Sequence, residues 1–88
     1  MKVSLQVAGT LKALHPGVRK DIRRALAYVD AGRKRDVRAL KKTLAGYYRL
    51  RVGKYRIIFR FDPTTGEIRA EFLERRESVY TSFTHPEG

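Results

Sequence analysis

The stretch from residue 47 to residue 60, YYRLRVGKYRIIFR, carries five basic side chains and no acidic one. Apolar residues alternate with arginines along it, so a strand would place the two kinds of side chain on opposite faces. Arg49 and Arg51 would lie about 7 Å apart on one face, and an adjacent antiparallel strand would add Arg56 and Arg60. Guanidinium groups bind phosphate oxygens through paired hydrogen bonds, so the pattern predicts an anion-binding surface.

Such a surface could stabilise the charge that develops when RNA is cleaved by its own 2′-hydroxyl. Arginine is a poor general base because its pKa stays above about 12, so proton transfer needs other groups. In the stretch LERRESVY, Tyr80 follows Arg75 and Arg76, and nearby positive charge stabilises a phenolate. From the residues alone, a core or capping role for Tyr80 is favoured over a catalytic one.

The charge of the whole chain supports an anionic partner. The 88 residues carry a formal net charge of +11, and residues 33–60 hold eleven Lys or Arg against one acid, Asp36. Regions of this kind bind nucleic acid, an anionic membrane surface or an acidic protein. The alternative is a solvated charged face, but unbalanced charge repels itself and opposes compaction, which favours a binding surface.

Several classes of protein are not expected. The chain has no cysteine and none of the common zinc, phosphate-loop or nucleophile-elbow motifs, so we expect neither a metal nor a cofactor. No apolar run approaches the ~18 residues of a membrane span, and the N-terminus is too polar for a signal-peptide core. The expected location is the cytoplasm, whose reducing conditions suit a domain without disulfides.

The elements that must position the basic side chains follow from periodicity. Residues 2–7 alternate and predict a strand, and residues 9–14 predict one or two helical turns. A helix over 16–31 begins at a proline suited to a first turn and carries one apolar face. Residues 33–46 predict a basic connection with weak helical spacing. The apolar residues of the predicted long helix are Val18, Ile22, Ala25, Leu26 and Val29.

Three strands are predicted after this connection, over 47–52, 55–61 and 67–74. Gly53 begins a two-residue hairpin loop between the first two. A Pro-Thr-Thr-Gly turn separates the second from the third. Strict alternation in the last strand predicts one face made of Ile68, Ala70 and Phe72.

Three segments in this order resemble the RelE/ParE superfamily of toxin–antitoxin toxins: LHPGVRKDIRRAL, VRALKKTLAGYYRLRVGKYRIIF and LERRESVY. The resemblance covers residues 2 to about 83. It implies one α+β domain over 1–88, with an N-terminal strand, a helical hairpin and a three-stranded antiparallel sheet. A short C-terminal helix or tail would follow, with 84–88 frayed.

The resemblance also implies an activity and partners. The RelE branch cleaves messenger RNA in the decoding site of the ribosome by 2′-hydroxyl attack, and the ParE branch poisons DNA gyrase. The ArgArg-x-x-Val-Tyr ending favours the nuclease branch. The implied partners are the ribosome, messenger RNA and an acidic RelB-like antitoxin in a hetero-oligomer. A gyrase poison and a decayed module that only binds RNA or antitoxin remain alternatives.

Residue roles follow from the same resemblance. Arg49 and Arg51 match two basic strand positions that are often lysine in the ribosome-dependent nucleases. Arg56 matches the arginine that contacts the scissile phosphate. Arginine is a weaker base than lysine, so the departure at Arg51 leaves the general base open.

The end of the chain supplies the remaining implied roles. Arg75 or Arg76 would place positive charge near the leaving group, and Tyr80 would stack on a base, transfer a proton, or both. Tyr80 is the first candidate for the missing base. The basic residues expected to contact RNA around this site are Arg33, Lys34, Lys41, Lys42, Lys54 and Arg60.

Overall fold

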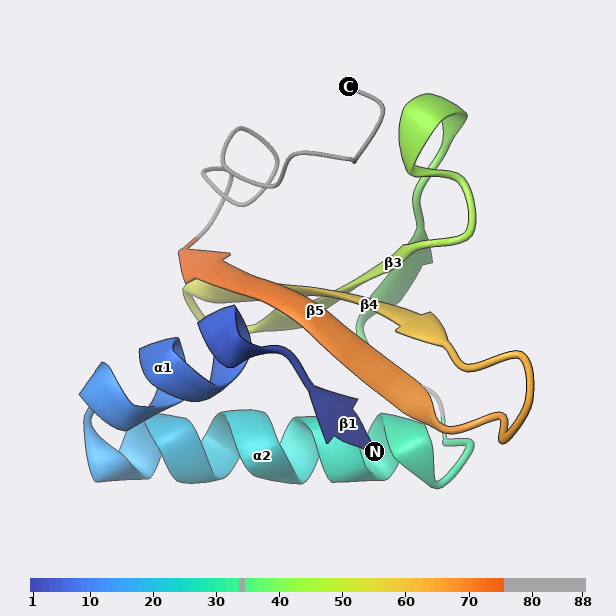
Figure 1. The fold of residues 1–88 in the computed structure, drawn as a ribbon. Coiled ribbons are helices and arrows are strands. Elements are labelled where there is room, and N and C mark those ends of the chain that lie inside the picture. Colours follow the sequence, from blue (N-terminus) through green and yellow to red (C-terminus); the bar gives the residue numbers. More distant parts are fainter. Residues whose placement is uncertain (34, 76–88) are drawn as a thin grey trace.

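A five-stranded sheet with two helices on one face forms the fold, seen in a computed structural model that describes residues 1–33 and 35–75 (Figure 1). The strand order is β1-β5-β4-β3-β2, with β1 parallel to β5 and every other pair antiparallel. The predicted three-stranded antiparallel sheet is therefore its centre, and a short strand extends each edge. The elements are β1 (Lys2–Val3), α1 (Leu5–Ala13), α2 (Pro16–Asp30), β2 (Val37–Ala39), the 3₁₀ helix η1 (Lys42–Leu44), β3 (Tyr48–Val52), β4 (Tyr55–Phe61) and β5 (Ile68–Arg75).

The N-terminal strand is much shorter than predicted, because Ser4 begins a helix. The Ser4 hydroxyl accepts a hydrogen bond from the backbone N–H of Val7 at 3.1 Å, which satisfies a donor that the first helical turn leaves unpaired. Leu5 is 93% exposed, whereas Val7 and Leu11 are buried. The apolar positions that matter are four residues apart, a helical spacing, and the alternation read from residues 2–7 was misleading.

The long helix α2 confirms its prediction. His15 precedes it and accepts the backbone N–H of Gly17 at 3.0 Å, and Pro16 occupies the first turn. The apolar face packs on the sheet, with Ile22 and Leu26 at most 1% exposed. A single stripe of this kind is what fixes the helix to the core.

The predicted basic connection over 33–46 contains a strand that its weak helical spacing did not indicate. Val37 pairs with Leu50 in β2, and the N–H of Leu40 donates to the carbonyl of Tyr47 at 2.9 Å. Lys42 then adopts a positive φ of 58°, at the start of η1. Pairing with β3 satisfies the backbone of this segment, so tertiary context overrides its weak helical spacing.

The last strand contains a bulge that the strict alternation missed. Ile58 of β4 lies opposite Phe72, but the next residue, Phe59, lies opposite Ala70, so Glu71 is an extra residue in β5. Phe72 consequently points away from the helices, and Leu73 is fully buried beneath them. The predicted face of Ile68, Ala70 and Phe72 is wrong at its third member.

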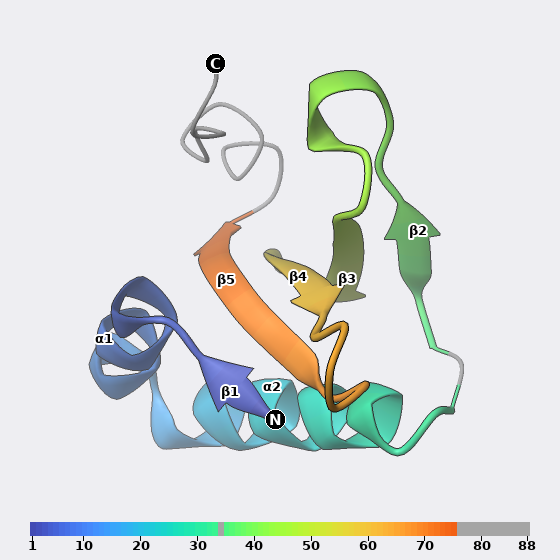
Figure 2. The same cartoon turned by 45° about the vertical axis from the view of Figure 1, so that its right-hand side comes forward.

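Both helices cover the same face of the sheet, as Figures 1 and 2 show. We call it the helix-side face. Its strand residues form the core with α1 and α2. The buried strand residues of the core are Leu50, Val52, Ile57, Phe59, Ile68, Ala70 and Leu73.

The β4–β5 turn depends on Asp62, which is only 9% exposed. Its carboxylate accepts the backbone N–H groups of Thr64 at 2.8 Å and Thr65 at 3.2 Å. These bonds, and then the charge of Arg69, lower the pKa of Asp62.

We expect Asp62→Ala to lower the urea midpoint of unfolding at pH 7. A carboxyl whose pKa is lower in the folded state stabilises the fold above its unfolded pKa of about 3.9, and this contribution is lost as pH falls through the folded value. The difference between wild type and variant should therefore shrink between pH 7 and about pH 2. Asp21→Asn, at an exposed position, is the control. Equal midpoints for wild type and Asp62→Ala at pH 7 would contradict the role.

Candidate functional site

Six arginines share the face of the sheet that points away from the helices. Residues that lie directly opposite each other on neighbouring strands project to the same face. Arg51 lies opposite Arg56, so the face expected from the sequence is formed. β2 and β5 extend it through two further pairs of opposed arginines. We call this surface the arginine face, and its arginines are Arg38, Arg49, Arg51, Arg56, Arg60 and Arg69.

Asp36 neutralises part of this face. Its carboxylate accepts hydrogen bonds from Nε of Arg51 and from the guanidinium of Arg49, the latter at 3.4 Å. The backbone carbonyl of Asp36 also accepts the N–H of Arg51 at 3.0 Å. The sequence marked Asp36 as the lone acid of a basic region, and the structure shows that it bridges two arginines predicted to bind phosphate.

The strand β5 supplies a second acid. Glu71, which follows the inward-facing Ala70, lies on the arginine face, and its carboxylate accepts Nε–H of Arg60 at 2.7 Å. This bond raises the pKa of Arg60 above its ordinary value. Arg69 is paired in turn with Asp62 at 3.5 Å. One end of the face is therefore largely balanced in charge.

The other end holds a carboxylate that has no hydrogen-bond partner among the described residues. Glu74 lies directly opposite Arg56, which lies directly opposite Arg51, so the three form one row across β5, β4 and β3. Neighbouring strands are about 4.8 Å apart, so the row spans roughly 10 Å. Arg56 donates to the carbonyls of Gly53 and Tyr55, both at 3.1 Å. Glu74 is half-buried and accepts no hydrogen bond from the rest of the described chain.

Arg49 retains an unused donor. Its side chain is only 12% exposed, and its Nε is buried without an acceptor among the described residues. Ile58, fully buried, lies opposite it on β4. A buried donor without an acceptor costs about 1–3 kcal/mol, and an incoming phosphate oxygen would relieve that cost.

The other predicted site residues are dispersed. Arg75 lies opposite Tyr55 and so projects to the helix-side face, away from the arginine row. Lys54 lies in the β3–β4 turn. Arg33 follows α2 with its guanidinium 5.4 Å from the ring of Tyr28. Lys41 and Lys42 are exposed at η1. Three predicted residues lie outside the described ones: Lys34, Arg76 and Tyr80.

Four members of the face were missed from the sequence. Glu71 was on the correct side by alternation but was not singled out, because its bond to Arg60 joins two strands. The other three were missed for local reasons. Arg38 escaped because the three-residue strand β2 was read as part of a connection. Glu74 shares the parity of core residues Ile68 and Ala70, so alternation assigned it to the covered side, and only the bulge reverses that. Arg69 lies four residues before the segment LERRESVY, outside the segments compared, and its alternation with Ile68 was the available signal.

We expect Asp36→Asn to strengthen binding of a short single-stranded RNA about two- to fivefold at low salt. The substitution frees two guanidiniums from a competing carboxylate, and phosphate binding is dominated by such charges. Fluorescence anisotropy at 50 and 200 mM salt would measure it. Asp21→Asn makes the same change in net charge on α2. Equal tightening by both variants would assign the effect to overall charge and contradict the specific role.

Neither a metal site nor a membrane span is found among the described residues. Over 1–33 and 35–75, no three His, Asp or Glu side chains gather in a way that could hold a metal ion. None of the helices in this part of the chain has the length and apolar composition needed to cross a membrane.

Comparison with known proteins identifies solved structures that share this fold. No family model matches the sequence, and neither does any curated protein. One chain of the RelB–RelE antitoxin–toxin complex from Methanococcus jannaschii matches with a TM-score of 0.73 and 24% identity, over 96% of this chain and 100% of that one. One chain of the toxin–antitoxin complex RelBE2 from Mycobacterium tuberculosis matches with a TM-score of 0.72 and 21% identity, over 85% and 94%. The chain shares its fold with a subunit of RelBE complexes. The resemblance seen in the sequence is thus supported at the level of the fold.

Proposed function

We propose that this chain is the toxin of a toxin–antitoxin pair and an endonuclease that cleaves messenger RNA on the ribosome. The likeness to subunits of RelBE complexes supports the first part. The observation that carries the second is the row of Arg51, Arg56 and Glu74 on one sheet face. It places a carboxylate, to which no other described residue bonds, beside guanidiniums that can hold a phosphate.

The chemistry uses the RNA's own nucleophile. The 2′-oxygen attacks the neighbouring phosphorus, a bond forms between them, and the bond from phosphorus to the 5′-oxygen breaks. Glu74 takes the proton of the 2′-hydroxyl, because it is a base where arginine is not. Arg56 and Arg51 hold the phosphate oxygens and stabilise the charge that they gain. A further acid must protonate the departing 5′-oxygen. The sequence named Tyr80 for proton transfer, first as the base, and with Glu74 in that role Tyr80 is proposed here as the acid.

The proposed inhibitor is an acidic antitoxin that folds on this chain. A segment rich in acidic residues is attracted to a chain of net charge +11. Binding should weaken as salt rises, because exposed charges are screened beyond about 10 Å at 0.1 M.

Primer extension on a defined message in a purified translation system tests the proposal. The protein is added with and without ribosomes, and cuts are mapped. Cuts confined to ribosome-bound message support the proposal, and cuts on free RNA indicate a ribosome-independent nuclease. If neither message is cut, the nuclease proposal fails, and a supercoiling assay then distinguishes a gyrase poison from a module that only binds.

A further inference from the structure

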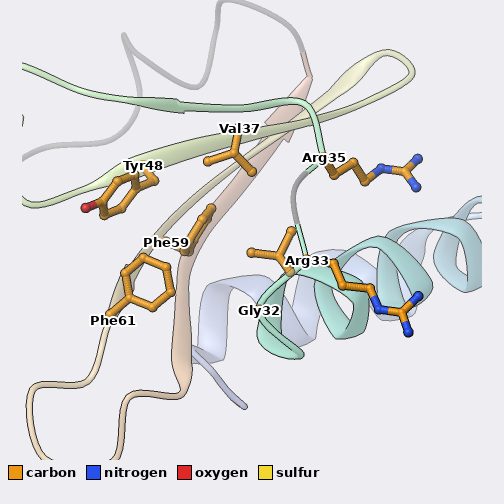
Figure 3. Close-up of a pocket in the computed structure, with 8 residues that line it drawn as sticks. Gly32, Arg33, Arg35, Val37, Tyr48, Phe59 and Phe61 are labelled. Atoms are coloured by element: carbon orange, nitrogen blue, oxygen red, sulfur yellow. The ribbon is translucent and has the colours of Figure 1, made fainter.

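A pocket of about 380 Å³ opens on the helix-side face, between the C-terminal end of α2 and the strands β2, β3 and β4 (Figure 3). Its walls are mainly aromatic and branched. Phe59 is fully buried at its base and Phe61 is 45% exposed at its margin. Tyr48 stacks on Phe59 with a centroid separation of 5.5 Å and meets Phe61 edge-on at 5.2 Å. An apolar surface of this kind gains free energy when another apolar side chain covers it.

The charge beside the pocket has one sign. Arg33 and Arg35 complete its lining, and Figure 3 shows their guanidiniums extending together from the side opposite the aromatic rings. Among residues 1–33 and 35–75, no acidic side chain lines the pocket. Carboxylates next to an apolar anchor would therefore find cations within reach.

The strand β2 borders the pocket and has an open edge. The carbonyl of Asp36 accepts from Arg51, and the N–H of Leu40 donates to Tyr47. Residues 36, 38 and 40 thus bond to β3, and the alternating pattern turns the backbone groups of Val37 and Ala39 away from it. β2 is the last strand in the sheet order, so these groups border no other strand of the described residues. The N–H of Val37 donates to the carbonyl of Arg35 at 2.6 Å, which leaves the carbonyl of Val37 and both backbone groups of Ala39 for an added strand. Open edges of this kind accept an extended segment as an additional strand.

We propose that β2 and the pocket form a docking site for an extended segment of a partner protein with alternating apolar and acidic residues. In an added strand, side chains beside Val37 and Ala39 project to the helix-side face, where the pocket takes them. Ala39 is small and leaves space. The side chain beside Arg38 projects instead to the arginine face, where a carboxylate pairs with a guanidinium. The register of the added strand thus requires apolar and acidic side chains to alternate along the partner's segment.

The two faces of β2 make the requirement specific. An entirely acidic segment would leave the pocket uncovered, and an entirely apolar one would leave Arg38 desolvated without a partner. The inference concerns a surface distinct from the Arg51–Arg56–Glu74 row. It therefore stands whether or not the chain cleaves RNA.

A synthetic peptide tests it, Glu-Val-Glu-Phe-Glu-Val-Glu with blocked ends and a fluorophore. The matched peptide carries Ser in place of each Val and Phe and has the same charge. Fluorescence anisotropy should show the alternating peptide binding at least about tenfold more tightly, a difference of about 1.4 kcal/mol. Equal affinity of the two peptides would mean binding by charge alone and would overturn the proposal, as would no binding of either.

Two variants locate the site. Ala39→Pro removes an N–H that faces away from β3, so the sheet is kept and an added strand loses a donor. Phe61→Ala removes the exposed margin of the pocket. Each should weaken binding about tenfold or more, whereas Leu5→Ala, with an apolar side chain 93% exposed on α1, should change it less than about twofold. Circular dichroism confirms folding. Unchanged affinity of folded Ala39→Pro and Phe61→Ala would place the peptide elsewhere.

Discussion

Replacing Glu74 with glutamine is expected to slow RNA cleavage by about two to four orders of magnitude and to leave RNA binding nearly unchanged. Glutamine keeps the size and polarity of the side chain but cannot accept a proton from the 2′-hydroxyl. Glu74 lies opposite Arg56 in the strand register, and no other described residue bonds to it. Single-turnover cleavage and anisotropy on the same message would separate the chemical step from binding.

Two companions make this result interpretable. Glu74→Asp keeps the carboxylate on a shorter side chain and should recover part of the rate. Asp21→Asn removes an exposed carboxylate on α2 and should cleave like wild type. If Glu74→Gln cuts RNA as fast as wild type, another group is the base. The conclusion that the chain is a nuclease would still stand.

The second large effect is expected at Arg56. Arg56→Ala should reduce cleavage about 100-fold, because one preorganised donor to the developing phosphate charge is lost. The guanidinium already bonds to two turn carbonyls at 3.1 Å, which restricts its movement before RNA arrives. Part of the loss should appear as weaker RNA binding, in contrast to Glu74→Gln.

Arg24→Ala is the matched control, because Arg24 is exposed on α2 and carries the same charge. Both variants lower the net charge by one, so long-range attraction to RNA falls equally. A difference in cleavage rate between the two variants would measure the contribution of the position of Arg56 on the arginine face. Equal losses would show that Arg56 contributes only through total charge.

The features predicted most accurately from the sequence are those that depend on residues close together in the chain. The β3–β4 hairpin was located because alternation and Gly53, with its φ of 56°, act within a few residues. The arginines on that hairpin were placed on one face for the same reason. The helix α2 was equally clear from a long apolar stripe.

The errors arose where distant segments decide. Ser4 caps the start of α1, and a serine at this position is a signal that the sequence contains. The short alternation of apolar and polar residues over 2–7 outweighed this signal in the prediction. β2 exists because β3 pairs with it, which no local pattern in residues 33–46 indicates. The sequence showed that Asp36 is the one acid of the basic region, but not which residues it contacts. Its contact with Arg51 depends on the pairing of β2 with β3.

The single extra residue in β5 acts as a change of phase along the strand. Ile68 and Ala70 point to the core on one side of Glu71, and Leu73 does so on the other, so even-numbered positions are inward before it and odd-numbered positions after it. If the strand instead alternated regularly through Glu71, with no bulge, Leu73 would turn to solvent and the carboxylate of Glu74 would be buried under α1. The bulge thus determines whether a carboxylate at position 74 stands among the arginines at all, independently of which side chains the strand carries.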